Sequence, residues 1–316
     1  MEITVEDIRA AAERIRPIAH RTPVLTSRTF DGLTGVTAYF KCENFQRGGA
    51  FKIRGAANFV YSIPAVERKR GVVAYSSGNH AQAVAIAAFS VGIPATLVMP
   101  LDAPRSKMEA TRGYGAAIVN YDRFKDDREA IGRRIADETG ATLVPPYDHA
   151  WTVAGQGTTA LELLAEVPEL DSLVVCLGGG GLASGCAIAA KTVRPGIRIF
   201  GVEPADGNDF WLSRNKGERV CIPPPTTLAD GLRAQTPGRI TWPIVQRLVD
   251  DLVTVTDDEI RETMRFMLTR MKMLVEPSGA VAAAAVLSHK LPQDLGRTGI
   301  IISGGNVDSD VLKQVL

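Results

Sequence analysis

The fold of this chain is decided by the stretch Ser172–Leu182, which reads SLVVCLGGGGL. Its first six residues are mostly apolar and include two valines, which is typical of a short buried strand. Four consecutive glycines follow, and good helix formers continue from Leu182 to Lys191. A buried strand that passes through a tight loop into a helix is the repeating unit of a parallel sheet covered by helices. The stretch therefore predicts an α/β protein.

The same alternation of strand and helix runs through most of the 316 residues. The pattern predicts strands at Thr37–Cys42, Val72–Tyr75, Ala95–Met99, Ala116–Asn120, Ser172–Leu177, Ile197–Val202 and Gly299–Ile302. It predicts helices at Val5–Ile15, Ala81–Val91, Lys107–Tyr114, Phe124–Thr139, Gly157–Glu166, Leu182–Lys191 and Asp257–Met273. We expect two domains, a small mobile one formed by residues 62–148 and inserted into a large cofactor-binding one formed by residues 1–61 and 149–316.

The composition narrows the class of protein. Hydrophobic residues make up 45% of the chain and charged residues 22%, which is ordinary for a folded protein. Thirty-six basic residues balance 35 acidic ones, so no net charge attracts nucleic acid or an anionic membrane. No apolar run reaches the roughly 18 residues of a membrane span, no signal pattern precedes Val5, and the four cysteines contain no CxxC pair that would indicate zinc. We expect a cytoplasmic protein that binds a small molecule.

One lysine, Lys52, lies between an aromatic residue and a run of small residues in the segment Phe51–Ala57. Burial would remove part of the solvation that favours its charged form, and the uncharged amine is the nucleophile that forms a Schiff base with a carbonyl. Most lysines are exposed, so a surface lysine at the start of a helix is the alternative interpretation.

Three loops that follow predicted strands carry groups suited to one ligand. Gly178–Gly181 would present unshielded backbone N–H groups at a helix start, which suits a phosphate; a tight packing loop is the alternative. Ser76–His80 offers hydroxyl, amide and N–H groups that suit a carboxylate, with N-capping by serine as the alternative. Ser303–Asn306 places a hydroxyl at the end of a buried strand. Open α/β sheets bind ligands at these strand ends, so with Lys52 the loops indicate a phosphorylated aldehyde.

Taken together and in this order, the motifs resemble those of the serine/threonine dehydratase and serine racemase family of fold type II pyridoxal-phosphate enzymes. They are Phe51–Ala56, Ser76–His80, Gly178–Gly181, Glu276–Ala280 and Ser303–Asn306. The resemblance extends from about Ile15 to Asn306. It implies a tryptophan synthase β-like fold, with two open, twisted, mostly parallel sheets flanked by helices, and it implies a homodimer.

The resemblance implies pyridoxal 5′-phosphate as the cofactor and assigns residues to it. Lys52 would form the Schiff base with the cofactor and later take the α-proton of the substrate, and Phe51 would pack against the cofactor ring. Asn79 would bond to the ring hydroxyl, and Ser303 would face the pyridine nitrogen. The phosphate would be held by the backbone N–H groups of Gly178, Gly179, Gly180, Gly181 and Leu182. A neutral hydroxyl at the pyridine nitrogen draws charge into the ring less fully than a carboxylate would, which favours prompt loss of a substituent.

The resemblance also assigns residues to the substrate. The turn that would hold the α-carboxylate consists of Ser76, Ser77, Gly78, Asn79 and His80. Ser77 matches the residue that serine racemases use as acid and base on the face opposite the lysine. Arg128 aligns with an arginine that approaches the substrate in serine racemases; a helix-surface arginine with partners three or four residues away is the alternative.

The segment Glu203–Asp209, EPADGND, resembles the loop with which the family binds a divalent cation. Glu203, Asp209 and the carbonyl of Gly207 would be the ligands. Carboxylate and carbonyl oxygens suit Mg²⁺, Ca²⁺ or Mn²⁺, with waters completing the shell. An acidic loop with solvated charges is the alternative.

The activity that the resemblance implies is that of a dehydratase, or ammonia-lyase, which eliminates water from a 3-hydroxy-L-amino acid such as L-threonine or L-serine. Racemisation of serine and dehydration of L-threo-3-hydroxyaspartate by an ammonia-lyase are the alternatives within the family. A noncatalytic metabolite-binding protein is the alternative outside it, because a fold does not fix a function. The chain has Gly48–Ala50 where relatives commonly have Thr-Gly-Ser, and Ala234 where many racemase-like members have a serine. The substrate is therefore less well specified than the cofactor.

Overall fold

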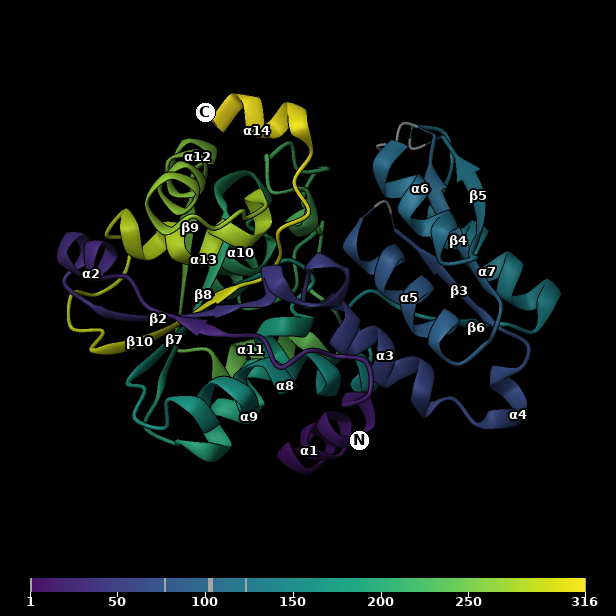
Figure 1. Cartoon of the computed structure of the whole chain (residues 1–316), viewed down its shortest axis with the longest axis horizontal. Coiled ribbons are helices and arrows are strands. Elements are labelled where there is room, and N and C mark those ends of the chain that lie inside the picture. The colour runs from purple at the N-terminus through teal and green to yellow at the C-terminus, as the bar shows by residue number, and fades with distance from the viewer. Residues whose placement is uncertain (1, 77, 102–104, 123, 316) are drawn as a thin grey trace.

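The computed structural model of the chain describes residues 2–76, 78–101, 105–122 and 124–315. Its strands form two sheets, one in each of two lobes (Figure 1). The six-stranded sheet has the order β1-β2-β10-β7-β8-β9, and the four-stranded sheet has the order β5-β4-β3-β6. Neighbouring strands are parallel except that β1 runs antiparallel to β2. The expected α/β class with two mostly parallel sheets is confirmed.

The bounds of the elements are as follows. The strands are β1 (Val24–Leu25), β2 (Thr37–Cys42), β3 (Val72–Tyr75), β4 (Ala95–Pro100), β5 (Ala117–Tyr121), β6 (Thr142–Leu143), β7 (Ser172–Cys176), β8 (Arg198–Pro204), β9 (Asp251–Val255) and β10 (Arg297–Ile302). The helices before β7 are α1 (Val5–Ile15), α2 (Arg28–Thr34), α3 (Lys52–Ser62), α4 (Ala65–Arg68), α5 (Asn79–Ser90), α6 (Arg105–Gly113), α7 (Arg128–Thr139) and α8 (Ala150–Glu166). The later helices are α9 (Gly181–Val193), α10 (Asp209–Lys216), α11 (Thr241–Leu248), α12 (Asp257–Phe266), α13 (Pro277–Leu287) and α14 (Ser309–Val315). Short turns of helix are η1 (Glu43–Phe45), η2 (Arg47–Gly49), η3 (Ala205–Gly207), η4 (Asp230–Leu232) and η5 (Met267–Met271).

Helices cover both faces of each sheet. In the view of Figure 1, α8, α9 and α11 lie on one side of the six-stranded sheet, and α12 and α13 lie on the other. In the small lobe, α5 and α7 lie on opposite sides of the four-stranded sheet (Figure 1). Helix α3 lies between the lobes and packs against both α5 and α8. The helix that begins at Lys52 therefore contacts both parts of the molecule.

Two clusters of buried apolar side chains form the cores. One fills the large lobe, and the other fills the small lobe but also includes Ile53, Ala56 and Phe59 of α3. The second core therefore includes residues that precede residue 62 in the chain. The division of the chain at residues 62 and 148, and the mobility of the small part, stay predictions.

Helix α8 begins at Ala150, well before its predicted start at Gly157. Its glycines are unfavourable in a helix interior by propensity alone. A methyl group on Gly155 would lie 2.4 Å from the carbonyl oxygen of Arg54, and one on Gly157 would lie 2.7 Å from that of Gly185. The glycines let α8 approach α3 and α9 backbone to backbone, so tertiary packing overrides propensity here.

Two other helices are shorter than predicted. Helix α7 begins at Arg128 rather than at Phe124, because the side chain of Asp127 caps it by accepting from two backbone N–H groups. Helix α12 ends at Phe266 and continues as the π-helical turn η5, after which Lys272 adopts a left-handed conformation with φ 60°. The apolar periodicity continues across this turn, which is why the sequence predicted one helix to Met273.

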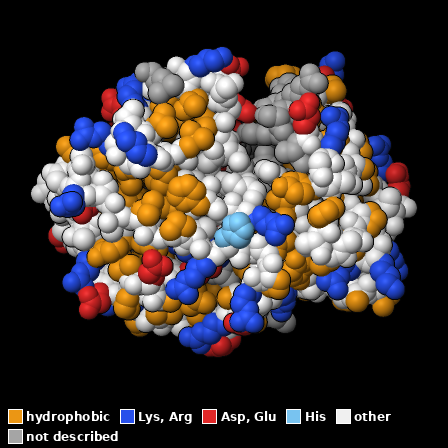
Figure 2. Space-filling model, viewed as in Figure 1, with side chains coloured by type: hydrophobic (Ala, Val, Ile, Leu, Met, Phe, Trp, Pro, Cys, Tyr) orange, Lys and Arg blue, Asp and Glu red, His pale blue; other side chains and the backbone are white. Residues whose placement is uncertain are grey.

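The surface carries no single-signed field on the face shown in Figure 2, where basic and acidic side chains are interspersed over both lobes. This distribution agrees with the balanced composition and with a small-molecule ligand. Within the part of the chain that the structure describes, no helix is long and apolar enough to cross a membrane.

Candidate active site

Lys52, the first residue of α3, lies beside the carboxyl end of β10. The backbone N–H of Phe51 donates to the carbonyl of Ser303 at 3.0 Å, and Ala50 forms a β-bridge with Gly304. Lys52 Nζ donates to the carbonyl of Pro146 at 3.0 Å and lies 5.1 Å from the centroid of the Phe51 ring. Segments around residues 52, 146 and 303 therefore meet at the start of α3.

The surroundings of Lys52 favour its uncharged form. Burial lowers the pKa of Lys52 from its ordinary 10.5 to about 8, although the carboxylate of Glu276 and the thiol of Cys176 act in the opposite direction. Near neutral pH a larger fraction of this half-buried amine is uncharged than in a surface lysine. The structure therefore favours the nucleophile over the surface-lysine alternative.

The glycine loop joins β7 to α9, and the side chains of Tyr147 and Phe210 lie close to its backbone. Gly180 has φ 86°, in the left-handed region that glycine adopts without strain, and is the N-cap of α9. A methyl group on Gly179 would lie 2.2 Å from Cγ of Tyr147, and one on Gly180 would lie 2.6 Å from Cζ of Phe210. The first N–H groups of a helix have no helical partner, so this loop is a cradle suited to a phosphate.

Asn79, the first residue of α5, is held from two sides. Its Nδ2 donates to Oε1 of Glu276 at 2.7 Å, and its Oδ1 accepts from Nδ2 of Asn306 at 2.9 Å. Asn306 also donates to the carbonyl of Gly48 at 2.7 Å. Glu276 is the N-cap residue of α13 and is buried. These contacts join the small lobe to the large lobe beside Lys52.

The turn Ser76–His80 is described in part, because Ser77 lies outside the described residues. The backbone N–H of Gly78 donates to Oγ of Ser76 at 3.2 Å. The His80 ring is buried, with Nε2 3.0 Å from the carbonyl of Val144, and burial lowers its pKa to about 3. The ring is neutral and Nε2 carries the proton, because a carbonyl only accepts. His80 thus offers a ligand its backbone rather than its ring.

Ser303 follows β10 and is buried, and its Oγ donates to the carbonyl of Ser278 at 3.3 Å. Cys176 ends the neighbouring strand β7. Burial raises the pKa of its thiol to about 11, against the opposing effects of Ser303 and Lys52. Ser303 and Cys176, at the ends of neighbouring strands, are therefore both uncharged near neutral pH.

Arg128 begins α7 and is exposed, with Cζ 5.8 Å from the centroid of the Tyr75 ring. Glu129 pairs with Arg133, and Arg128 forms no ion pair with any residue that the structure describes. Arg128 is thus an exposed arginine at the helix surface, without an ion-pair partner three or four residues away among the described residues, and its role stays a prediction. Burial raises the pKa of the hydroxyl of Tyr147, the residue whose ring packs on Gly179.

Glu203 and Asp209 form a pair of buried carboxylates at the end of β8 and the start of α10. The two oxygens of Glu203 accept from the backbone N–H groups of Phe210 at 3.0 Å and Trp211 at 2.7 Å. Both oxygens of Asp209 are buried without a hydrogen-bond partner among the described residues. Burial raises the pKa of Asp209 to about 7, and burial together with Asp209 raises that of Glu203. Buried, unpartnered carboxylate oxygens fit a cation.

Glu203 and Asp209 alone supply fewer side-chain ligands than a divalent cation requires. Among the described residues, no group of three or more His, Cys, Asp or Glu side chains could hold a metal ion. Gly207 is buried in η3, between the two carboxylates in sequence. A cation here would need a backbone carbonyl and water, as the resemblance implies.

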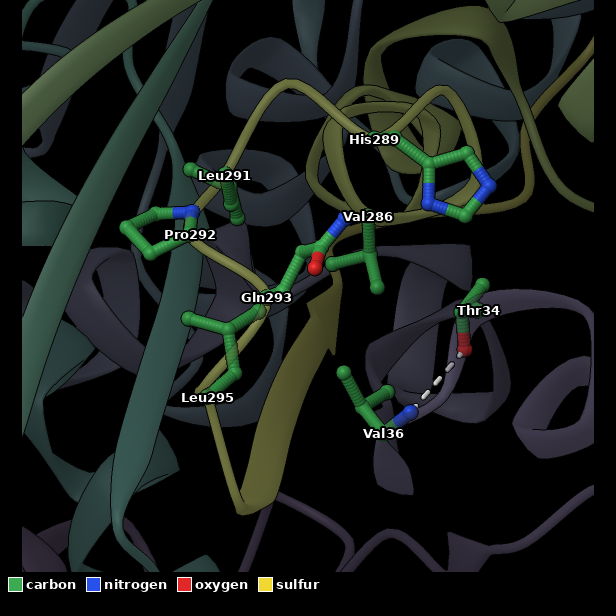
Figure 3. A pocket seen from close by; sticks show the side chains of 8 residues that line it. All are labelled: Thr34, Val36, Val286, His289, Leu291, Pro292, Gln293 and Leu295. Carbon is green, nitrogen blue, oxygen red and sulfur yellow. Dashed lines mark hydrogen bonds between the residues drawn. The ribbon is translucent and has the colours of Figure 1, made fainter.

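The pocket drawn in Figure 3 lies at the amino ends of strands β2 and β10, whereas Lys52 lies beside the carboxyl end of β10. It is lined by Thr34, Val36, Val286, His289, Leu291, Pro292, Gln293 and Leu295 (Figure 3). Val36 and Leu295 precede β2 and β10, whereas Lys52 and Ser303 follow them. Its volume of about 10 Å³ suits one water molecule at most. This pocket plays no part in the candidate site.

Residues 15–304 match the protein family described as Pyridoxal-phosphate dependent enzyme. The chain belongs to this family. It is 50% identical to serine racemase of Schizosaccharomyces pombe over 305 residues, covering 96% of this chain and 94% of that protein. It is 51% identical to L-threo-3-hydroxyaspartate ammonia-lyase of Saccharomyces cerevisiae over 305 residues, covering 96% and 94%. The solved structure of maize serine racemase matches with a TM-score of 0.95 and 45% identity, covering 99% of this chain and 97% of that one.

The family, the fold type and the enzyme class that the motifs implied are therefore confirmed. Pyridoxal phosphate is the cofactor of this family, and the residues present fit it. Lys52 supplies an amine of lowered pKa, the glycine loop supplies a cradle that a side chain would fill, and Ser303 supplies a buried hydroxyl. The individual roles of these residues stay predictions.

Sequence reasoning missed three contributors to the site. Tyr147 packs on the glycine loop, Pro146 accepts the hydrogen bond from Lys52, and Glu276 binds Asn79. Glu276 opens one of the quoted motifs, which was a signal without an assigned role. Tyr147 and Pro146 lie in the connection between β6 and α8, and a connection shows no period that would reveal which ligand it approaches.

Proposed function

We propose that the chain is a pyridoxal-phosphate-dependent ammonia-lyase that converts a 3-hydroxy-L-amino acid into a 2-oxo acid and ammonia. The observation that carries the proposal is the half-buried Lys52 amine of lowered pKa at the start of α3, where the backbone N–H of the preceding residue, Phe51, donates to the carbonyl of Ser303. Equal amounts of ammonia and 2-oxo acid formed from L-threonine, L-serine or L-threo-3-hydroxyaspartate would support it. No oxo acid from any of the three would overturn it.

The residues of the chain divide the chemistry among them. When bound, pyridoxal phosphate withdraws electrons from Cα of an amino acid and makes the α-proton acidic. Lys52 Nζ accepts that proton, for which an amine with a pKa of about 8 is suited near neutral pH. The N–H groups of the glycine loop fix the phosphate. Ser303 would offer the ring a hydrogen bond but no full charge, which favours loss of the 3-hydroxyl group, and the proton that Lys52 has accepted balances its departure as water.

L-threo-3-hydroxyaspartate is the second candidate substrate, and Arg128 favours it. The guanidinium is exposed, stacked over Tyr75 and without a carboxylate partner among the described residues. An arginine without an ion-pair partner among the described residues suits the second carboxylate of an acidic substrate. The 51% identity to the yeast L-threo-3-hydroxyaspartate ammonia-lyase supports the same candidate.

Replacing Arg128 by alanine is expected to lower kcat/KM for L-threo-3-hydroxyaspartate by about 10- to 100-fold, because a charge-assisted hydrogen bond to the second carboxylate is lost. The value for L-threonine should change by no more than about 2-fold, since threonine has no second carboxylate. Arg133→Ala is the matched control, because Arg133 is on the same helix and is paired with Glu129. Equal losses for both substrates would remove Arg128 from substrate recognition.

Serine racemisation is the activity named for the Schizosaccharomyces pombe relative. Ser77, the residue that the resemblance places opposite Lys52, lies outside the described residues. We propose racemisation as a side activity, in line with the name of this relative, and it is measured as D-serine formed during incubation with L-serine.

We propose a divalent cation, Mg²⁺, Ca²⁺ or Mn²⁺, between Glu203 and Asp209 with the carbonyl of Gly207. The support is the pair of buried oxygens on Asp209 that have no hydrogen-bond partner among the described residues. The ion would stabilise the charged forms of both carboxyl groups, whose pKa values burial raises.

Replacing Asp209 by asparagine is expected to weaken Ca²⁺ binding about 10-fold or more, because a charged ligand is lost from a site with two carboxylates. The fold should be kept, since the amide has the same shape and removes a buried charge. Isothermal titration of the purified protein with Ca²⁺ measures the affinity. Asp206→Asn is the control, because Asp206 is an exposed aspartate of the same loop. Equal Ca²⁺ affinity in wild type and Asp209→Asn would place the ion elsewhere.

We propose a cytoplasmic homodimer as the working form of the enzyme. Phe45 and Leu274 are 50% and 44% exposed, and Nδ2 of Asn44 donates to the carbonyl of Leu274 at 3.1 Å, so the two apolar side chains come from adjoining segments. A second copy of the chain would cover them. Light scattering of the protein in solution tests this, and a monomer at micromolar concentration would contradict it.

A further inference from the structure

We propose that Phe210 is a positioning residue that transmits cation binding at Glu203 and Asp209 to the glycine loop Gly178–Gly181. In this mechanism the ion fixes the Phe210 ring, and the ring fixes the loop in the conformation that holds the cofactor phosphate. The inference rests on the proposed cation site.

At the cation end, Phe210 is bonded to both carboxylate residues. It follows Asp209 directly in α10, and its backbone N–H donates to Oε1 of Glu203 at 3.0 Å. An ion that draws the two carboxylates together must therefore move or hold the peptide unit that carries the Phe210 ring. An ion would bind there because the buried oxygens of Asp209 have no hydrogen-bond partner among the described residues.

At the cofactor end, the same ring abuts the loop. Phe210 is fully buried, and a methyl group on Gly180 would lie 2.6 Å from its Cζ atom. Gly180 is the residue where the loop turns into α9, with φ 86°. On the same side, Oγ1 of Thr241 donates to the carbonyl of Gly179 at 2.8 Å. The tip of the ring therefore contacts the loop at its turning point.

Close packing around Phe210 lets a shift of its ring reach the glycine loop. The Phe210 ring also packs on Trp242, with ring centroids 6.0 Å apart, so the ring has little room to yield sideways. Close-packed interiors pass on small shifts instead of absorbing them. By linkage, a cation that tightens cofactor binding must itself bind more tightly when the cofactor is present, by the same factor.

Long-range attraction between the ion and the cofactor phosphate is the competing explanation. It depends on charge and distance alone, so it would survive any apolar substitution at residue 210. Transmission through packing depends on the reach of the side chain. Leucine and methionine separate the two, because they have similar volumes but leucine is branched and short whereas methionine is unbranched and long.

The experiment measures the dissociation constant of pyridoxal phosphate by visible absorbance, with chelator and with saturating Mg²⁺. In the wild type we expect the cation to lower this constant by about 5-fold or more. In Phe210→Leu the ratio should fall to less than about 2-fold, and in Phe210→Met part of the wild-type ratio should return. Isothermal titration without cofactor should show that both variants still bind Mg²⁺.

Phe30→Leu is the matched control, because Phe30 is a fully buried ring of the same core that packs on Phe40 at 5.0 Å and Phe266 at 5.9 Å. It should lower the melting temperature without changing the ratio. A wild-type ratio in Phe210→Leu would overturn the inference in favour of charge attraction. Mg²⁺ binding without any effect on cofactor affinity in the wild type would overturn it too, while leaving the cation site in place. A wild type that binds no cation at all would overturn both.

Discussion

Replacing Lys52 by alanine is expected to lower 2-oxo acid formation by about 10³-fold or more and to abolish the visible absorbance of the bound cofactor. The expectation follows from two tasks that one amine performs, covalent attachment of the cofactor and acceptance of the α-proton. The lowered pKa of about 8 suits the amine to both. Ammonia release from L-threonine in excess pyridoxal phosphate measures the first effect, and an absorption spectrum after gel filtration measures the second.

Measuring the stability of the cofactor-free protein distinguishes a loss of chemistry in Lys52→Ala from a loss of folding. The pKa of Lys52 in the folded state, about 8, lies below its ordinary value of 10.5, so between these values the folded state binds fewer protons than the unfolded state. The contribution of Lys52 to stability is therefore unfavourable below pH 8 and this cost disappears as the pH rises towards 10.5. Lys52→Ala should be at least as stable as wild type at neutral pH and should lack this rise. A folded Lys52→Ala protein that keeps activity would refute the assignment.

Replacing Gly179 by alanine is expected to raise the dissociation constant of the cofactor by about 10- to 100-fold. A methyl group at this position would lie 2.2 Å from Cγ of Tyr147, so either the ring or the loop must move. Moving the loop misdirects N–H groups that donate to the phosphate, and each charge-assisted hydrogen bond is worth about 1.5–3 kcal/mol. Titration with pyridoxal phosphate, followed by absorbance, measures the effect.

Gly196→Ala is the control for this variant. A methyl group on Gly196 meets no atom within 4 Å, so the substitution tests the loss of a glycine without the clash. Its cofactor affinity should equal that of the wild type. Wild-type affinity in Gly179→Ala as well would show that the loop does not hold the phosphate.

Much of the fold was predictable because its strands are short, buried and bounded by clear breakers. Strands β2 and β3 have the predicted bounds, Thr37–Cys42 and Val72–Tyr75. The start of α7 was wrong because of the local cap by Asp127, and the largest error, the start of α8, lies where tertiary contacts override local preference. Helix α8 includes Gly155 and Gly157 because neighbouring backbones approach it there, and a sequence does not display which backbone will come near.

The residues of the candidate site that belong to a sequence motif were predictable. The residues that act only by contacting a motif were not. Lys52 and the glycine loop stand out in the sequence, since few other functions require those residue types in that order. Tyr147, Phe210 and the Pro146 carbonyl act by touching the motifs from connections and helix starts. Their residue types are compatible with many positions, so only the folded chain shows what they contact.

The central claim, elimination of water, is tested most directly by following both products of one incubation. Purified protein with pyridoxal phosphate is given L-serine, L-threonine or L-threo-3-hydroxyaspartate, and the 2-oxo acid and the D- or epimerised amino acid are quantified together. We expect oxo acid and ammonia in equal amounts, with the inverted amino acid a minor product. Inverted amino acid formed faster than oxo acid from every substrate would contradict the claim and establish a racemase.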